Sequence, residues 1–73
     1  MDYLVWADEY LEEARRILDV IEKKKTKLKE GSLSRDDRKT LNDTIISYRV
    51  IYRELLGTAQ RLRERAGEQS HAA

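Results

Sequence analysis

The fold is decided by residues 23–37, KKKTKLKEGSLSRDD, which have the features of a helix end, a short turn and a second helix start. Gly31 follows a lysine-rich last turn, and glycine readily adopts the left-handed conformation that ends many helices while lysines complement the helix dipole. Ser34 is a good N-cap, and Asp36 and Asp37 place acidic groups in the next first turn. We therefore predict a helix over about 2–30, a turn over 31–34 and a helix from about 35.

The second predicted helix continues without a strong interruption, because the chain has no proline and its other glycines are Gly57 and Gly67. We expect it to end near Ala66. The last residues, 67–73, are short, small and polar, so they are predicted to form a flexible tail. This places one domain, a helical hairpin, over residues 1–66.

Hydrophobic periodicity supports two amphipathic helices of about four heptads each. Apolar residues recur at alternating spacings of three and four, with Tyr3, Tyr10, Ile17, Ile51 and Leu56 widening the two stripes. The predicted fold class is all-α, an antiparallel two-helix hairpin that dimerises into a four-helix bundle. The predicted core consists of Leu4, Ala7, Leu11, Ala14, Leu18, Ile21, Leu28, Leu41, Ile45, Tyr48, Tyr52, Leu55, Ala59 and Leu62.

The same stripes predict the register of the hairpin. If the numbers of facing residues sum to about 69 or 70, each seam alanine meets a leucine, as for Ala14 with Leu55, and layer volume stays nearly constant. Charge agrees with this pairing, since residues 1–22 hold seven acids against Arg15 and Arg16, net −5, while residues 44–66 hold five arginines against two glutamates, net +3.

The chain is too small to build a large core alone. It has 73 residues and a mass of 8.6 kDa, and two helices bury only part of each apolar stripe. A homodimeric bundle about a twofold axis solves this most simply. A larger protein that completes the helical seam would satisfy the same physics.

Composition argues against several classes of function. Without cysteine the chain has no disulfide, thiolate nucleophile or sulfur-based metal site, and no apolar run is long enough to span a membrane. The only histidine, His71, falls in the predicted tail. We therefore expect a cytoplasmic protein that is not an enzyme and has no cofactor, catalytic residue, metal site or membrane association.

Two features are candidate contact sites. Residues 23–30 contain five lysines against one glutamate, net +4: Lys23, Lys24, Lys25, Lys27 and Lys29. Two interpretations are open. Either these lysines bind nucleic-acid phosphates or another anion, or they only complement the helix dipole and keep the bundle soluble. Off the main seams, Trp6, Ile46 and Val50 are candidates for a partner-binding patch, although Trp6 could equally cover the open end of the bundle.

The short turn and the alternating alanine and leucine layers of residues 3–66 resemble the Rop-like antiparallel helical-hairpin proteins. That resemblance implies a dimeric four-helix bundle and, as one alternative, a nucleic-acid-binding regulator that uses the lysine-rich turn end. The residues themselves favour a small non-catalytic protein-protein interaction or regulatory module. An accessory subunit whose seam a larger partner completes is the third hypothesis.

Overall fold

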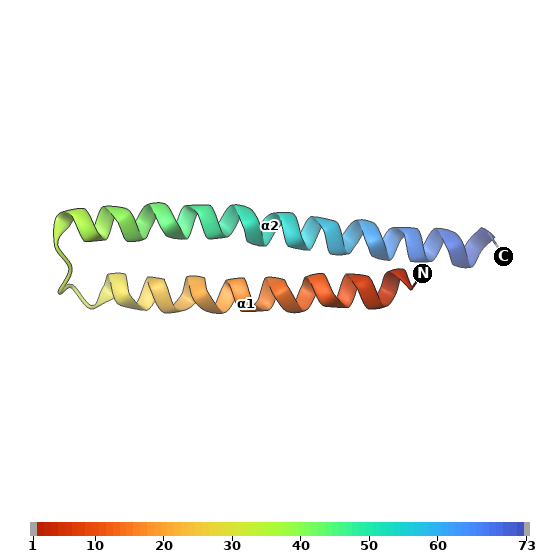
Figure 1. Ribbon diagram of the computed structural model, residues 1–73, viewed down its shortest axis with the longest axis horizontal. Helices are drawn as coiled ribbons and strands as arrows, with labels where there is room; N and C mark the ends of the chain where they lie inside the picture. Colours follow the sequence, from red (N-terminus) through yellow and green to blue (C-terminus); the bar gives the residue numbers. More distant parts are fainter. Residues whose placement is uncertain (1, 73) are drawn as a thin grey trace.

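The computed structural model is an antiparallel helical hairpin and describes residues 2–72, with side chains up to Glu68 (Figure 1). Helix α1 spans Tyr3–Lys29 and helix α2 spans Arg35–Ala72. The two helices pack side by side, so that both chain ends lie opposite the turn. The molecule is a rod of 59 × 15 × 14 Å. The predicted all-α hairpin is confirmed.

The helix ends show why the chain turns where it does. The Asp2 carboxylate begins α1 by accepting hydrogen bonds from the backbone N–H groups of Leu4, at 3.0 Å, and Val5, at 3.3 Å. Gly31 has a φ of 73°, the left-handed conformation expected after a helix. The Ser34 hydroxyl then accepts a hydrogen bond of 3.2 Å from the backbone N–H of Asp37 and starts α2. The turn at residues 31–34 is thus built as predicted.

The end of α2 differs from the prediction. The helix continues through Gly67 to Ala72 instead of ending near Ala66, and Gly67 does not have a positive φ. The physical reason is that glycine permits a helix end but does not impose one, and no proline follows it. The helix therefore extends over residues 67–72, which the sequence assigned to the tail. The side chain of His71 lies outside the described residues.

The core is a narrow line of small and aliphatic side chains between the helices. Its buried members are Ala7, Ala14, Ile21, Ile45, Ala59 and Leu62. At the open end of the hairpin, Ala7, Ala59 and Leu62 form one cluster, against which Tyr3, Tyr10 and Leu11 pack. The predicted register pairs Ala7 with Leu62 and Leu11 with Ala59, and all four residues belong to this cluster or pack against it.

Two residues of the predicted core are exposed. Leu4 and Leu18 retain 56% and 39% of their surface. Residues seven apart stack in columns along a helix, and the column of Leu4, Leu11 and Leu18 lies beside the central column that faces α2. A single helix covers the central column fully and this neighbouring column only in part, since Leu11 still packs against the open-end cluster. The hairpin therefore buries Ala14 and leaves Leu18 at the flank.

Within the described residues, neither helix has a stretch long and apolar enough to cross a membrane.

Candidate interaction surfaces

The lysine-rich end of α1 lies beside the turn, and its five cations have different surroundings. Lys23 pairs with Asp19 at 3.5 Å and Lys25 with Glu22 at 3.5 Å. The Lys24 ammonium lies over the ring of Tyr48, 5.8 Å from its centroid, in a cation–π contact that joins the two helices. Lys27 and Lys29 form no ion pair with any residue that the structure describes.

An open groove between the helices adjoins these lysines. It has a volume of about 400 Å³ and is open to solvent. Its lining comes from both helices and the turn: Lys24, Lys27, Leu33, Asp37, Thr40, Leu41 and Thr44. Because Asp37 partly offsets the two lysines, this groove is basic but not purely cationic.

One long side of the hairpin carries a half-covered surface rich in aromatic and β-branched side chains. We call it the aromatic face, and it consists of Trp6, Tyr10, Ile17, Val20, Tyr48, Ile51 and Leu55. Trp6 and Ile51 are each 41% exposed. The sequence marked Tyr10, Ile17 and Ile51 only as flanks of the seams, because the face becomes visible only when the two helices are placed side by side.

At the open end of the aromatic face the rings form a second groove. The Trp6 ring stacks on that of Tyr3, with centroids 6.4 Å apart and planes at 27°. The groove, about 200 Å³ in volume, is lined by Trp6, Glu9, Tyr10, Glu13 and Leu55. Trp6 therefore borders an open groove and is partly exposed.

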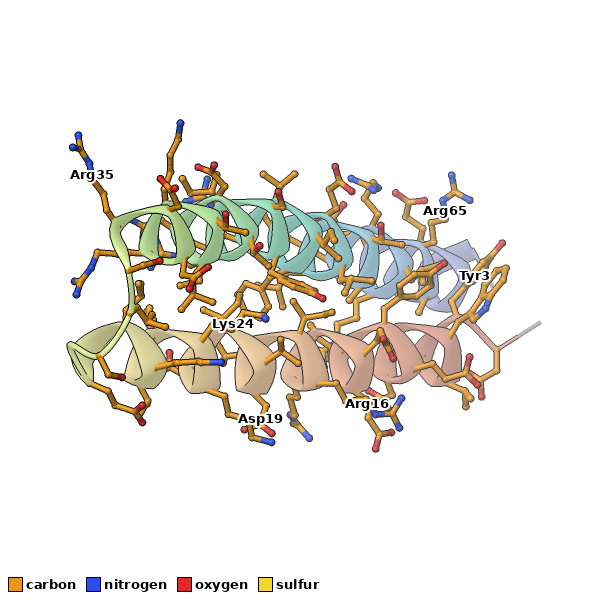
Figure 2. The ribbon with its side chains drawn as sticks, turned by 60° about the vertical axis from the view of Figure 1, so that its left-hand side comes forward. Tyr3, Arg16, Asp19, Lys24, Arg35 and Arg65 are labelled. Atoms are coloured by element: carbon orange, nitrogen blue, oxygen red, sulfur yellow. The ribbon has the colours of Figure 1, made fainter. Side chains whose placement is uncertain are left out.

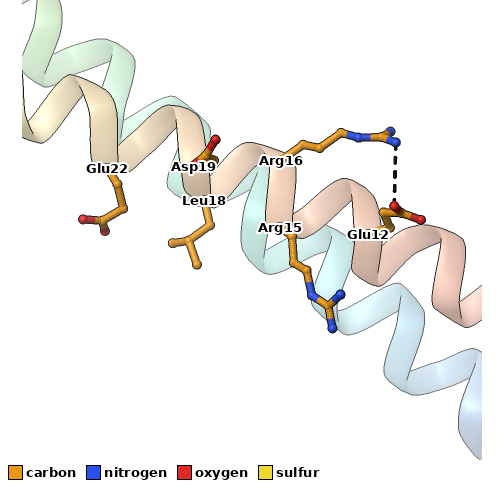
Figure 3. A pocket seen from close by; sticks show the side chains of 6 residues that line it. All are labelled: Glu12, Arg15, Arg16, Leu18, Asp19 and Glu22. Carbon is orange, nitrogen blue, oxygen red and sulfur yellow. Dashed lines mark ion pairs between the residues drawn. The ribbon is translucent and has the colours of Figure 1, made fainter.

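The opposite flank of α1 carries leucines among charges. Figure 3 shows Leu18 among the side chains of Arg15, Asp19 and Glu22, in a shallow depression of the helix surface. Arg16 reaches Glu13 at 3.0 Å and Glu12 at 4.0 Å on the outer side of α1. Figure 2 likewise shows Arg16 and Asp19 pointing away from α2. We call Leu4, Leu11, Leu18 and Leu56 the leucine face.

The remaining candidates, Ile46 and Val50, are exposed on α2. They are four residues apart and so lie on one side of that helix, turned away from the buried column of Ile45 and Ala59. The structure does not join them to Trp6, so they form a separate and smaller apolar spot.

Charge pairing between the helices is sparse. Arg63 contacts Asp8 at 3.9 Å, which links the arginine-rich part of α2 to the acidic part of α1 as expected. Both side chains are mostly exposed, and such surface pairs contribute only about 0–1 kcal/mol. The contact helps to set the pairing of the helices more than their stability. No group of three or more His, Cys, Asp or Glu side chains able to hold a metal ion occurs among the described residues.

Comparisons of this chain with protein-family models, with curated proteins and with solved structures found no match.

Proposed function

We propose that this protein is a small non-catalytic interaction or regulatory module that acts as a homodimeric four-helix bundle. The observation that carries the proposal is the amount of surface the hairpin leaves uncovered. Among the residues whose side chains the structure describes, six are buried, whereas eight large hydrophobic side chains are exposed, Trp6 and Ile51 among them. Apolar surface on this scale is typical of an interaction site.

The hairpin exposes more surface than a compact protein of the same mass. The hairpin exposes 5846 Å², whereas a compact monomer of this mass exposes about 4,700 Å². The excess of roughly 1,100 Å² exceeds the approximately 800 Å² that each partner contributes to a standard stable interface. The radius of gyration, 17.0 Å, is likewise far above the roughly 11 Å of a compact domain of this length. A second hairpin packed alongside would bury surface of this order, while the length of the rod would stay the same.

Sedimentation equilibrium over a dilution series tests the proposal. We expect a mass of twice 8.6 kDa that persists into the low micromolar range, together with strong helical circular dichroism. A poorly folded monomer would contradict the homodimer and support an accessory subunit whose seam a larger protein completes.

A second candidate function is nucleic-acid binding through the turn end. Lys27 and Lys29, which lack a described ion-pair partner, support it, because unpaired lysines are free to neutralise phosphates. A gel-shift experiment at low salt with mixed RNA and DNA should show binding that Lys23→Glu with Lys27→Glu abolishes. Arg53→Glu with Arg65→Glu, an equal charge change away from the turn, is the matched control. Unchanged nucleic-acid mobility at micromolar wild-type protein would rule this function out.

A further inference from the structure

We infer that the hairpin binds a second copy of itself through the aromatic face, with the two turns at opposite ends of the bundle and the twofold axis at the level of Ile51. This inference rests on the proposed homodimer and specifies its surface and its symmetry. It follows from a comparison of the two long sides of the hairpin and from the distribution of charge along one of them.

The two sides differ at the positions that a partner hairpin would cover. On α1, the outer column of the aromatic face contains Trp6, Glu13, Val20 and Lys27, whereas the corresponding column of the leucine face contains charged residues only, Asp8, Arg15, Glu22 and Lys29. Covering the leucine face would remove these charges from water, and buried charges are costly unless each is well paired. The aromatic face also has the tryptophan and tyrosine composition of interface hot spots. It is therefore the side better suited to a partner.

On α2 the difference is smaller. The outer column of the aromatic face contains Thr44, Ile51 and Thr58 between Asp37 and Arg65, whereas the column of the leucine face contains Leu56 between Arg49 and Arg63. Threonine hydroxyls can be satisfied by the carbonyl of their own helix, and both threonines do this, at 2.9 and 3.0 Å. Neither threonine therefore needs water at the dimer interface.

The aromatic face is acidic at one end and basic at the other. The groove at the open end contains Glu9 and Glu13, and the groove near the turn contains Lys24 and Lys27. Glu13 and Lys27 are fourteen residues apart, so they occupy equivalent heptad positions. Both grooves thus lie on one side of the hairpin, separated by roughly 21 Å along α1.

This polarity selects the orientation of the partner. With the turns at opposite ends, α1 packs against α1 of the second copy in antiparallel fashion, and each glutamate pair lies opposite a lysine pair. With the turns together, both lysine pairs gather at one end of the bundle and both glutamate pairs at the other. Complementary charge across an interface fixes orientation in this way.

On both helices, the residues of the aromatic face are arranged nearly symmetrically about the proposed twofold axis at the level of Ile51. On α2, Thr44 and Thr58 lie seven residues on either side of Ile51, so that this face is nearly symmetric about Ile51. On α1, Glu13 and Lys24 are equidistant from a point between Ile17 and Val20. In the register seen in the open-end core, that point lies level with Ile51. A twofold interface requires such self-complementarity of one patch.

The location of the interface is tested with two neighbouring residues of similar exposure, Ile51 at 41% and Val50 at 49%. Sedimentation equilibrium should show that Ile51→Glu raises the dimer dissociation constant by at least about 100-fold, because the new carboxylate would be buried at the axis. Val50→Glu, on the outer side of α2, should leave the constant within about twofold of wild type. A dimer that tolerates Ile51→Glu but is lost on Leu18→Glu would overturn the inference while leaving the homodimer intact. A wild-type chain that is monomeric throughout would overturn both.

The orientation is tested by charge reversal at the two ends of the face. Glu9→Lys with Glu13→Lys, and separately Lys24→Glu with Lys27→Glu, should each weaken the dimer about 5- to 30-fold, because like charges then meet at both ends. The four changes combined restore opposite charges and should recover near wild-type affinity. Glu12→Lys with Asp19→Lys, on the outer side of α1, is the control with equal charge change. If the losses of dimer affinity instead add up in the variant with all four changes, the orientation with the two turns at opposite ends is wrong.

Discussion

Ala14 shows how a single side chain sets the distance between the helices. It is 1% exposed in the central column of α1, and the register places it opposite Leu55. We predict that Ala14→Leu lowers the free energy of unfolding by about 1–3 kcal/mol through overpacking, and that adding Leu55→Ala recovers part of the loss. Urea unfolding followed by circular dichroism at fixed protein concentration measures both. Simple additivity of the two changes would show that these residues do not face each other.

Gly31 and Gly57 differ in backbone conformation, so alanine at the two positions should have opposite effects on stability. Gly31 has a positive φ with nothing near the space a Cβ would occupy, so Gly31→Ala should cost about 1–2 kcal/mol from backbone conformation alone. Gly57 is helical, and its Cβ would meet only the end of the Arg61 side chain at an ordinary 3.6 Å. Gly57→Ala should therefore stabilise the protein by about 0.5–1 kcal/mol. Thermal melts of both variants would contradict this interpretation if their shifts had the same sign.

At the scale of elements, the start of α2 depends on one hydroxyl. Ser34 accepts from the Asp37 N–H at 3.2 Å, whereas the Ser47 hydroxyl only donates to its own helix, to the Asp43 carbonyl at 3.2 Å. We predict that Ser34→Ala lowers stability by about 1 kcal/mol, because an N-terminal donor of the helix loses its partner. Ser47→Ala should be neutral or slightly stabilising, since alanine has the higher helix propensity. Chemical unfolding of the matched pair tests the cap, and equal effects would argue against it.

At the scale of the whole molecule, the proposed dimer links stability to concentration. Because folding and association are then one equilibrium, the melting temperature should fall by about 5 °C for each tenfold dilution. Differential scanning calorimetry over a hundredfold concentration range measures this shift. A melting temperature independent of concentration would identify a hairpin that folds alone, and would contradict the proposed bundle.

The local sequence determined the two helices and the turn between them. Gly31 and Ser34 end one helix and begin the next through backbone hydrogen bonding within a few residues, so their effects can be predicted without knowledge of the fold. The alanine and leucine layers of Ala7 and Leu62 likewise predicted the register, because side-chain volume must match across a close-packed contact. Gly67 was misjudged, since glycine allows a helix either to stop or to continue.

Only the tertiary structure decided which flank of each stripe is covered. The sequence placed Leu4 and Leu18 in the core, but α2 covers the central column of α1 and leaves both exposed. Heptad spacing leaves this choice open, because the columns on either side of Ala14 have the same period. The aromatic face, where Tyr10 from α1 meets Leu55 from α2, exists only once the helices lie together. Side chains distant in sequence become one surface through packing, and that surface carries the proposed dimer.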